Sequence, residues 1–378
     1  MTEPLKLEPI YDTDEGPGAA GSGSTERLDR WLELLIQMAG SDLLLLHGVP
    51  PCVRMNGEVK RIGERSLLSS EIEQSVMPAL TPGALRTYRE SRIGDCSYRL
   101  LNRGRFRINI HSERDRAAVA IRALPQKVPL FRDLHLPRAA ESLLRVSRGL
   151  VLIGGPAGAG KTTTMAALIH EINQKDAKHI ITIEDPIEYE HQNLQSVIEQ
   201  VEIGIDVENF PTALRSSLRQ APDVLVIGEM RDPETVRIAL GAAETGHLVL
   251  STLHTTDVTA TIARLADAFP AERQNWIRQE LAATLAAVFT QVLVPSNKGG
   301  RVPAVELLMV GYGARQHIRR NMLQHLHQEI TITKRSGSLT FEESLAQLVA
   351  DGHINRDDAM TYAIHPEDLD SLLRNPRA

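Results

Sequence analysis

The sequence predicts an α/β protein with a mostly parallel sheet, preceded by a smaller α+β domain and followed by a helical region. The first observation is that, from Gly149 onward, short apolar runs alternate with helix-favouring stretches, as they do in a parallel sheet covered on both faces. The runs are Gly149–Ile153, Ile180–Ile183, Val224–Ile227 and Leu248–Leu253. The second is that apolar and polar residues alternate in Arg105–Ile110, which indicates a half-buried strand of an antiparallel sheet. The third is that helical patterns dominate from about Glu306 onward.

Length and composition limit the protein class. A chain of 378 residues suggests two domains plus a tail or linker, and 42% hydrophobic with 24% charged residues is typical of a globular protein. A net charge of −6 and only 4% aromatic residues do not favour nucleic acid as a partner. Cys52 and Cys96 provide neither a disulfide framework nor a tetracysteine zinc site, so we expect reduced thiols in the cytoplasm.

No membrane-spanning or secretory segment is expected. No apolar stretch reaches the roughly 18–20 residues that span a bilayer. The acidic, proline-containing start of the chain lacks the basic and apolar regions of a signal peptide. We therefore expect no direct membrane insertion, and any membrane association would come through a protein partner.

Composition and periodicity divide the chain into five parts. Residues 1–25 end in a Gly/Ser-rich run and are expected to form a disordered leader. An N-terminal α+β domain follows at 26–130, then a linker at 131–147, a core at 148–305 and a helical region at 306–378. Within the N-terminal domain we expect a helix from Glu26, a buried strand at Leu43–Leu46, a type I′ hairpin at Asn56-Gly57, and a helical segment at 69–92 broken by prolines. Further strands are expected at Ser97–Leu101, Arg105–Ile110 and Ala117–Leu124, and a helix at Arg138–Val146.

The core begins with a phosphate-binding loop. The first apolar run is followed by a glycine-rich segment that matches G-x-x-x-x-G-K-[ST] and then by a helix-favouring run, the setting that this motif requires. The residues are Gly155, Pro156, Ala157, Gly158, Ala159, Gly160, Lys161 and Thr162, with Thr163 next in the helix. The glycines let successive N–H groups converge on one anion, Lys161 can reach the β- and γ-phosphates, and the Thr162 hydroxyl can bind Mg²⁺. The chain is therefore expected to bind a nucleoside triphosphate.

Two acidic residues follow neighbouring apolar runs. Glu184 ends the run at Ile180–Ile183, and a carboxylate there can orient and deprotonate an attacking water. Glu229 follows Val224–Ile227 and Gly228 in the Walker B arrangement, where an acid holds Mg²⁺. A solvated acidic turn is the alternative interpretation of the stretch that contains Glu184. Because ligands of open α/β sheets bind beyond the carboxyl ends of the strands, both acids should converge with the loop.

Histidines and arginines form two further signals. His247 and His254 flank the run Leu248–Leu253, and His254, at the end that we expect to face the loop, is the better candidate for contact with phosphate; a structural role is the alternative for both. The N-terminal domain contains a group of arginines in which alternation places three on one strand face, with no acidic run nearby to pair with them. The group is Arg103, Arg105, Arg107, Arg114, Arg116 and Arg122. It is either a solvated basic edge or a set of arginines delivered to the γ-phosphate of a neighbouring subunit.

With these motifs in hand, the sequence resembles the type IV pilus retraction ATPases, the PilT-like branch of the secretion ATPase superfamily. GPAGAGKTTT resembles the Walker A motif of that family, TIEDPIEYEH its acidic box, VLVIGEMRDPET its Walker B motif and GHLVLSTLHT its histidine box. SDLLLLHGVPPCVRMNGEV and GRFRINI resemble its PAS-like N-terminal domain, and ESLAQLVADGHINRDDAM its helical C-terminus. The family's A-I-R-N-L-I-R-E helix appears here as 314–320 (ARQHIRR), a departure that suits an accessory paralogue.

The resemblance implies a RecA-like core and a homo-hexameric ring with ATP and Mg²⁺ at the subunit interfaces. Glu184 is then the general base, Glu229 the Mg²⁺ ligand, and His247 and His254 the two histidines of the box. Arg107 and Arg122 match the family's paired arginines, and Arg114 falls close to a third. The implied work is pilus retraction in twitching motility, as main or accessory ATPase, by a cytoplasmic ring that acts on an inner-membrane platform protein, in some systems beside a paralogous pilus ATPase.

Three other functions remain open. A pilus-assembly or type II secretion ATPase usually has a longer N-terminal region and a zinc-binding cysteine cluster. A nucleotide-gated ring would bind ATP with little hydrolysis, so measured turnover would identify it. A RecA-like motor on nucleic acid would bind DNA in a salt-dependent manner.

Overall fold

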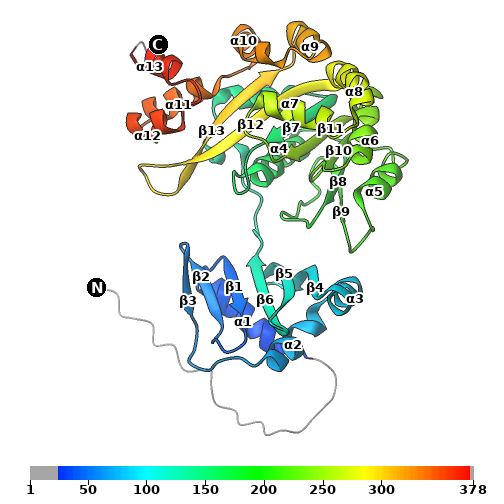
Figure 1. Cartoon of the computed structure of the whole chain (residues 1–378), viewed down its shortest axis with the longest axis vertical. Coiled ribbons are helices and arrows are strands. Elements are labelled where there is room, and N and C mark those ends of the chain that lie inside the picture. The colour runs from blue at the N-terminus through cyan, green and yellow to red at the C-terminus, as the bar shows by residue number, and fades with distance from the viewer. Residues whose placement is uncertain (1–23, 375–378) are drawn as a thin grey trace. The chain divides into compact units, whose positions relative to one another are not determined.

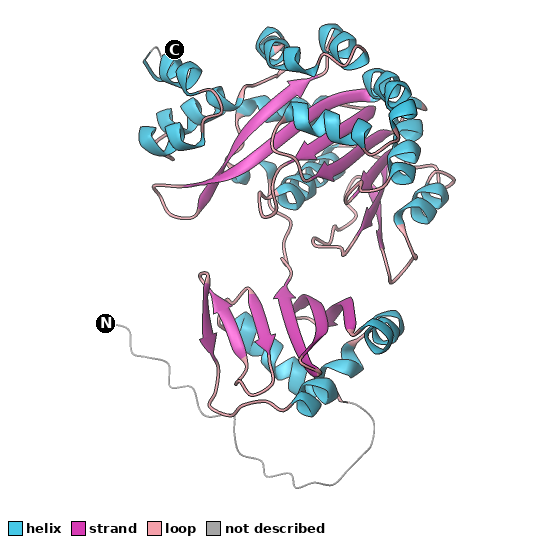
Figure 2. Ribbon diagram, in the orientation of Figure 1, coloured by secondary structure: helices cyan, strands magenta, loops and turns pink. Residues whose placement is uncertain are grey.

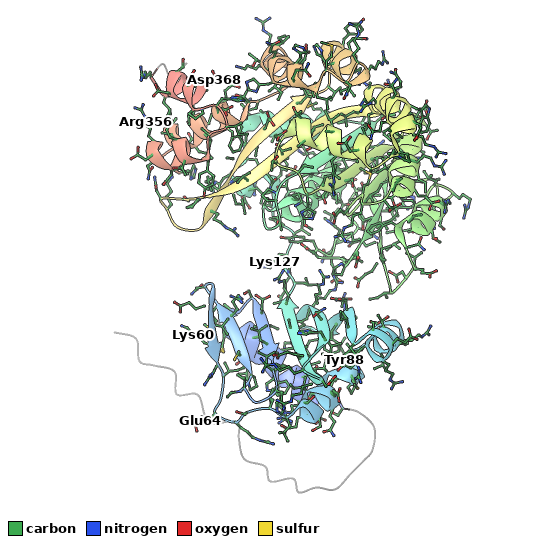
Figure 3. The ribbon with its side chains drawn as sticks, viewed as in Figure 1. Lys60, Glu64, Tyr88, Lys127, Arg356 and Asp368 are labelled. Carbon is green, nitrogen blue, oxygen red and sulfur yellow. The ribbon has the colours of Figure 1, made fainter. Side chains whose placement is uncertain are left out.

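The computed structural model describes residues 24–374, and its contacts divide the chain into two compact units, Met1–Gln126 and Lys127–Ala378. Each unit contains one sheet and its own helices (Figures 1 and 2). The expected leader lies outside the described residues except for Ser24 and Thr25. Lys127, labelled in Figure 3, begins the second unit, so the expected linker, core and helical region all belong to one compact body.

The first unit is an α+β domain around a six-stranded sheet in the order β3-β2-β1-β6-β5-β4. Every pair of neighbouring strands in it is antiparallel. Its elements are α1 (Glu26–Gln37), β1 (Asp42–Leu45), β2 (Cys52–Met55), β3 (Glu58–Arg61), α2 (Ser69–Val76), a 3₁₀ turn (Met77–Ala79), α3 (Pro82–Ser91), β4 (Ile93–Leu100), β5 (Gly104–Glu113) and β6 (Arg116–Ala123). The hairpin prediction is confirmed, since Asn56 and Gly57 both have positive φ, 50° and 88°, between β2 and β3.

Helices cover one face of this sheet. Apolar residues of α1, α2 and α3 pack with alternate residues of the strands in a single core. The strand expected at Leu43–Leu46 is present as β1, but only one of its faces is buried: Leu43 and Leu45 are buried, whereas Asp42 and Leu44 are half-exposed. An antiparallel sheet with one covered face buries only every second side chain.

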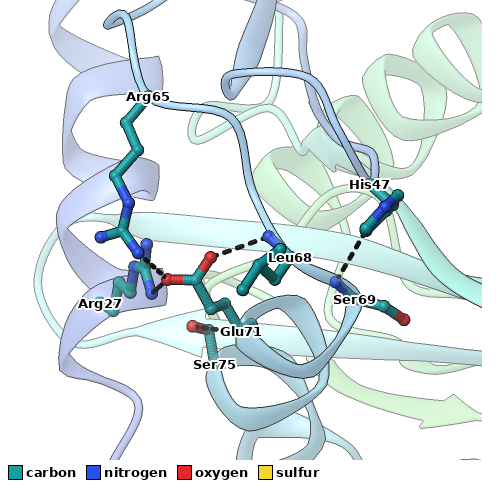
Figure 4. Close-up of polar contacts among 7 residues, drawn as sticks. All are labelled: Arg27, His47, Arg65, Leu68, Ser69, Glu71 and Ser75. Atoms are coloured by element: carbon teal, nitrogen blue, oxygen red, sulfur yellow. Dashed lines mark hydrogen bonds and ion pairs between the residues drawn. The ribbon is translucent and has the colours of Figure 1, made fainter. Parts of the chain in front are cut away.

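A carboxylate joins three segments of the first unit (Figure 4). Glu71 of α2 lies 3.3 Å from the Arg27 guanidinium of α1 and 2.6 Å from that of Arg65, which precedes α2. Its other oxygen accepts a hydrogen bond from the Leu68 N–H at 2.8 Å. Burial opposes ionisation of Glu71, but the Leu68 amide and the two arginines outweigh it, so the pKa of Glu71 is lowered. The ionised carboxylate therefore holds α1 and α2 together.

The second unit contains a seven-stranded sheet in the order β13-β12-β7-β11-β10-β8-β9. Strands β12 through β9 run parallel, and β13 is antiparallel to β12. The strands are β7 (Gly149–Gly154), β8 (His179–Glu184), β9 (Val197–Glu202), β10 (Val224–Ile227), β11 (Leu248–Leu253), β12 (Leu285–Pro295) and β13 (Arg301–Met309). The helices are α4 (Lys161–Lys175), α5 (Phe210–Ser217), α6 (Pro233–Glu244), α7 (Val258–Asp267), α8 (Ala271–Thr284), α9 (Tyr312–Arg319), α10 (Leu326–Ile332), α11 (Phe341–Ala350), α12 (Arg356–Tyr362) and α13 (Pro366–Arg374).

The parallel α/β core is confirmed, with separate apolar clusters on the two faces of the sheet. Three of its strands were not expected from the sequence: β9, β12 and β13. The last of these continues to Met309, so the proposed core boundary at 305 falls within a strand. The segment Arg138–Arg145 is helical as expected, but it is a 3₁₀ helix. Among the described residues, no helix is both long enough and apolar enough to cross a membrane.

Candidate functional site

The phosphate loop connects the buried strand β7 to α4. Gly155, Gly158 and Gly160 have φ of 151°, 75° and 86°, values that side chains with a Cβ atom rarely adopt. A Cβ atom on Gly155 would also lie 2.5 Å from the carbonyl oxygen of Gln291, so that position has no room for a side chain. The loop ends at the N-terminus of α4, where free N–H groups favour an anion.

Lys161 lies folded back onto this loop. Its side chain is buried, and Nζ donates to the carbonyl oxygens of Gly155 at 2.8 Å and Pro156 at 3.0 Å. Burial lowers the pKa of Lys161, while the charges of Glu229 and Glu188 act in the opposite direction. A bound phosphate would offer Nζ stronger acceptors than these two carbonyls.

The strand ends converge as expected. Ile183, Ile227 and Ser251 are register partners across β8, β10 and β11, and Leu253 pairs with Gly154 at the start of the loop. The residues that follow these strands therefore reach one edge of the sheet. Nδ1 of His254 lies 3.3 Å from Nζ of Lys161, and Nε2 of His254 lies 3.7 Å from Glu229.

Glu184 occupies a different part of the same edge. Its carboxylate accepts hydrogen bonds from Oγ1 of Thr182 at 2.8 Å and from Nε2 of Gln200 at 3.2 Å. Burial raises the pKa of Glu184, and Glu188 raises it further, although the hydrogen bonds from Thr182 and Gln200 oppose the shift. A carboxylate with a raised pKa and a fixed orientation is suited to accept a proton.

Four residues at this edge were missed by the sequence analysis. Arg231 contacts the Glu229 carboxylate at 2.7 Å, and Glu188 acts electrostatically on both Lys161 and Glu184. Tyr189 lies 3.0 Å from Oγ1 of Thr163, and the buried Gln291 of β12 accepts from Thr164 at 2.8 Å. Gln291 also donates to the carbonyl of Ala159. Glu188, Tyr189 and Arg231 lie inside the acidic and Walker B motifs, and this position was the only feature of the sequence that could have identified them. No feature of the sequence could have identified Gln291, because β12 itself was not expected.

His247 lies at the other end of β11. It precedes Leu248, the register partner of Gly149 at the start of β7, whereas the loop follows the far end of β7. Six residues of strand span about 20 Å, so His247 does not reach the loop of its own subunit. Its Nδ1 lies 2.9 Å from the Ala242 carbonyl, beside a cavity of about 430 Å³ that Lys178 and Asp223 also line.

Several arginines of this group have acidic partners, contrary to the expectation that no acidic run nearby could pair with them. Arg103 lies in the turn before β5 rather than on the strand face, and its guanidinium is 3.6 Å from Glu33 of α1. Arg107 is 3.7 Å from Asp95, Arg114 is 3.7 Å from Glu113, and Arg122 is 2.9 Å from Asp42. These partners come from helix α1, from other strands or from an adjacent position, and a search for an acidic run does not detect them. Arg107 and Arg122 are register partners on β5 and β6 and share one face.

The chain is similar in sequence to known proteins. The type II/IV secretion system protein family model matches residues 116–351. The chain is 37% identical over 333 residues to the type IV pilus retraction ATPase PilT of Pseudomonas aeruginosa, covering 88% of this chain and 97% of that protein. It is 34% identical to the type IV pilus ATPase PilU of the same organism, over 92% of this chain and 91% of the relative. The chain belongs to the PilT-like branch of the secretion ATPase family.

Two solved structures have a similar fold. A crystal structure of the pilus retraction motor PilT with bound ADP superposes with a TM-score of 0.83 at 38% identity, covering 91% of this chain and 99% of that one. The ATPase DotB of Legionella pneumophila gives a TM-score of 0.79 at 26% identity, covering 91% and 97%. These relatives favour a retraction ATPase over the assembly and secretion alternatives.

Proposed function

We propose that this chain hydrolyses ATP in a homo-hexameric ring and uses that energy to drive type IV pilus retraction. The observation that supports it best is the convergence of Lys161, His254 and Glu229 at the end of the phosphate loop, with separations of 3.3 and 3.7 Å. The PilT structure similar to this chain holds ADP, which supports a nucleotide at the loop.

Residues of the second unit have different roles in ATP hydrolysis in this proposal. The loop N–H groups and Lys161 bind and orient the phosphates, and Glu184 accepts the proton of the attacking water. The Thr162 hydroxyl and the Glu229 carboxylate are oxygen donors of the kind that Mg²⁺ prefers, and bound Mg²⁺ would neutralise phosphate charge. Arg231 already neutralises Glu229 at 2.7 Å, so it must release the carboxylate for that role. Replacing Glu184 with Gln should abolish turnover and leave ADP binding within about threefold, because the amide keeps the shape but cannot take a proton.

Arginines of the first unit complete the site of a neighbouring subunit in this proposal. Arg107 and Arg122 lie side by side on one sheet face, and Asp42 and Asp95 hold their guanidinium groups in the directions observed. Arg114, at the end of the same hairpin, is the third candidate. Arginines supplied in trans stabilise the charge of the transition state, so Arg107→Ala or Arg122→Ala should lower turnover far more than nucleotide affinity.

The partners follow from the same proposal. The ring would act in the cytoplasm on an inner-membrane platform protein, as the main retraction ATPase or as an accessory to a paralogous one. The departure of 314–320 from the family's retraction helix supports the accessory role. Deleting the gene distinguishes the two directions of movement: hyperpiliated cells that do not twitch indicate retraction, and cells without pili indicate assembly.

The decisive experiment measures ATP turnover per subunit as a function of protein concentration. If the neighbouring subunit completes each site, specific activity should rise cooperatively and then reach a plateau on ring assembly. Specific activity that stays constant down to monomer concentrations would contradict the shared site.

A further inference from the structure

One side chain of β9, Gln200, makes three hydrogen bonds beside Glu184. Its Nε2 donates to the Glu184 carboxylate at 3.2 Å and to the carbonyl oxygen of Tyr189 at 2.9 Å. Its Oε1 accepts a hydrogen bond from the backbone N–H of His191 at 2.8 Å. Turning the amide by 180° would place its oxygen against two acceptors and its nitrogen against a donor. These three partners therefore fix the orientation of the Gln200 side chain.

The strand register places Gln200 where it can reach the base. Gln200 lies opposite Thr182 in the parallel pair of β9 and β8, two residues before Glu184. Oγ1 of Thr182 and Nε2 of Gln200 donate to the same carboxylate oxygen of Glu184, Oε1. Ile198, which shares a face of β9 with Gln200, packs in the apolar cluster that contains residues of α4. Gln200 therefore lies on the face of the sheet that α4 covers.

The connection between β8 and β9, residues 185–196, lies along α4, and we call it the strap. Near the start of α4, the Tyr189 hydroxyl lies 3.0 Å from Oγ1 of Thr163. Toward the end of the helix, the buried side chain of Asn173 makes two hydrogen bonds with the strap backbone, at 2.7 and 3.2 Å. Gln200 binds the strap at the same residue, Tyr189, that contacts the phosphate-loop helix.

Acidic residues surround Glu184. Asp185 follows it in the chain, Glu188 belongs to the strap, and Glu202 is its register partner on β9. Burial and the Glu188 charge raise the pKa of Glu184, whereas the hydrogen bonds from Thr182 and Gln200 lower it. Gln200 therefore stabilises the ionised form of a carboxylate that its other neighbours disfavour.

We propose that Gln200 is a positioning residue for ATP hydrolysis, which orients the Glu184 carboxylate and holds the strap against the phosphate-loop helix. The assignment rests on the proposed role of Glu184 as the general base. Gln200 contacts neither nucleotide nor water in this scheme and acts through Glu184 and Tyr189. Its loss should therefore lower the rate of the hydrolytic step more than it weakens nucleotide binding.

The test is the pH–turnover profile of the full chain with Gln200→Met, which keeps the length of the side chain and removes its three hydrogen bonds. The acid limb should move to higher pH, because the ionised Glu184 carboxylate loses a donor. This direction is opposite to that expected for Glu188→Gln. Turnover on the plateau should also fall about tenfold, because the carboxylate loses its fixed orientation. The KM for ATP should change by less than about threefold.

A second variant and a control complete the set. Gln200→Glu keeps the shape of the side chain and an acceptor for the His191 N–H, but it lacks both amide donors. It should move the acid limb in the same direction, and it provides the test if Gln200→Met does not fold. Gln220→Met, the same substitution at an exposed glutamine after α5, should leave the profile unchanged.

Combination with Glu184→Gln separates the positioning role from the proposed function. Gln200→Met should not lower the residual turnover of Glu184→Gln any further, because no base remains to be positioned. If Glu184→Gln is inactive but both Gln200 variants keep the original acid limb and plateau, the positioning role is wrong. A loss of ADP affinity as large as the loss of turnover would also overturn it. If Glu184→Gln retains full turnover, the proposed base has failed instead.

Discussion

Lys161 and His254 lie side by side at the carboxyl edge of the second sheet, with Nζ 3.3 Å from Nδ1. An ammonium group can only donate, so Nδ1 accepts and the ring proton belongs on Nε2. That nitrogen is 3.7 Å from the Glu229 carboxylate. The His254 imidazole therefore lies between the phosphate-binding lysine and the Walker B acid.

The first prediction concerns this connection. His254→Ala should lower ATP turnover about 10- to 100-fold and change ADP affinity by less than about threefold, because it frees Lys161 and Glu229 from their shared orientation. Steady-state turnover and calorimetric ADP titration measure the two effects. His247→Ala is the matched control, since His247 lies at the opposite end of β11. An equal loss of ATP turnover in both variants would show that the catalytic contribution of a histidine does not depend on which end of β11 it occupies.

The second prediction concerns the pH dependence of turnover. Burial and then Glu188 raise the pKa of Glu184, so the acid limb of the pH–turnover profile should lie above the ordinary carboxyl range. Glu188→Gln removes one negative charge beside the base, lowers the pKa of Glu184 and should move this limb to lower pH. Glu208→Gln, an exposed acid, is the control and should leave the limb in place. A limb that does not move in Glu188→Gln would argue against Glu184 as the base.

The third prediction concerns a buried carboxyl beside the loop edge. Glu306 of β13 is the register partner of Thr290 of β12, and Thr290 is in turn the register partner of Gly154 of β7. The Glu306 carboxylate accepts a hydrogen bond from the Val258 N–H of α7 at 2.9 Å. Burial raises the pKa of Glu306 to about 7, and the charges of Asp257 and Glu342 contribute.

The folded state binds the Glu306 carboxyl proton more tightly than the unfolded chain does. Below the ordinary carboxyl pKa, Glu306 is protonated in both states and does not lower the free energy of unfolding. Its penalty grows as pH rises toward 7, to about 3 kcal/mol. Glu306→Gln keeps an acceptor for Val258 and should remove this pH dependence. The pH dependence of the unfolding free energy is measured by urea unfolding at several pH values. Both proteins carry Trp31→Phe, so that Trp276 fluorescence alone reports the unfolding. If Glu306→Gln retains the full pH slope, another group is responsible.

The fourth prediction concerns the first unit. Glu71→Gln removes the charge that holds Arg27 and Arg65 and should lower the unfolding free energy by about 1–3 kcal/mol. The pKa of Glu71 is lowered in the folded state, because the Leu68 amide and the arginines outweigh burial. Its contribution is therefore complete above the ordinary carboxyl pKa and is lost as pH falls through the lowered value.

Trp31 reports this unfolding because the Arg27 guanidinium lies 5.0 Å from its ring, and Trp276→Phe removes the other indole. Glu64→Gln serves as the control for loss of an exposed acid. Equal stability of Glu71→Gln and its control at neutral pH would mean that the three-segment connection is not stabilising.

Local patterns predicted much of the fold and site. The phosphate loop, the hairpin at Asn56-Gly57 and the boundaries of β10 and β11 agree with the sequence because backbone angles and buried runs are encoded within a few residues. Glu184, Glu229 and His254 could be placed at one edge because parallel strands end together. Strand β12 and its Gln291 could not, since no adjacent residue indicates that a glutamine will be buried against the loop.

By itself, the sequence determined that a phosphate loop precedes a parallel α/β core and that acids and a histidine end its strands, because these features depend on short spacing and strand polarity. Only the tertiary structure decided which groups meet: Lys161 with His254, Arg122 with Asp42, and Arg107 with Asp95. These pairs form between residues on different strands or loops, and the separation of such residues in space is fixed by strand order and register rather than by their spacing along the chain.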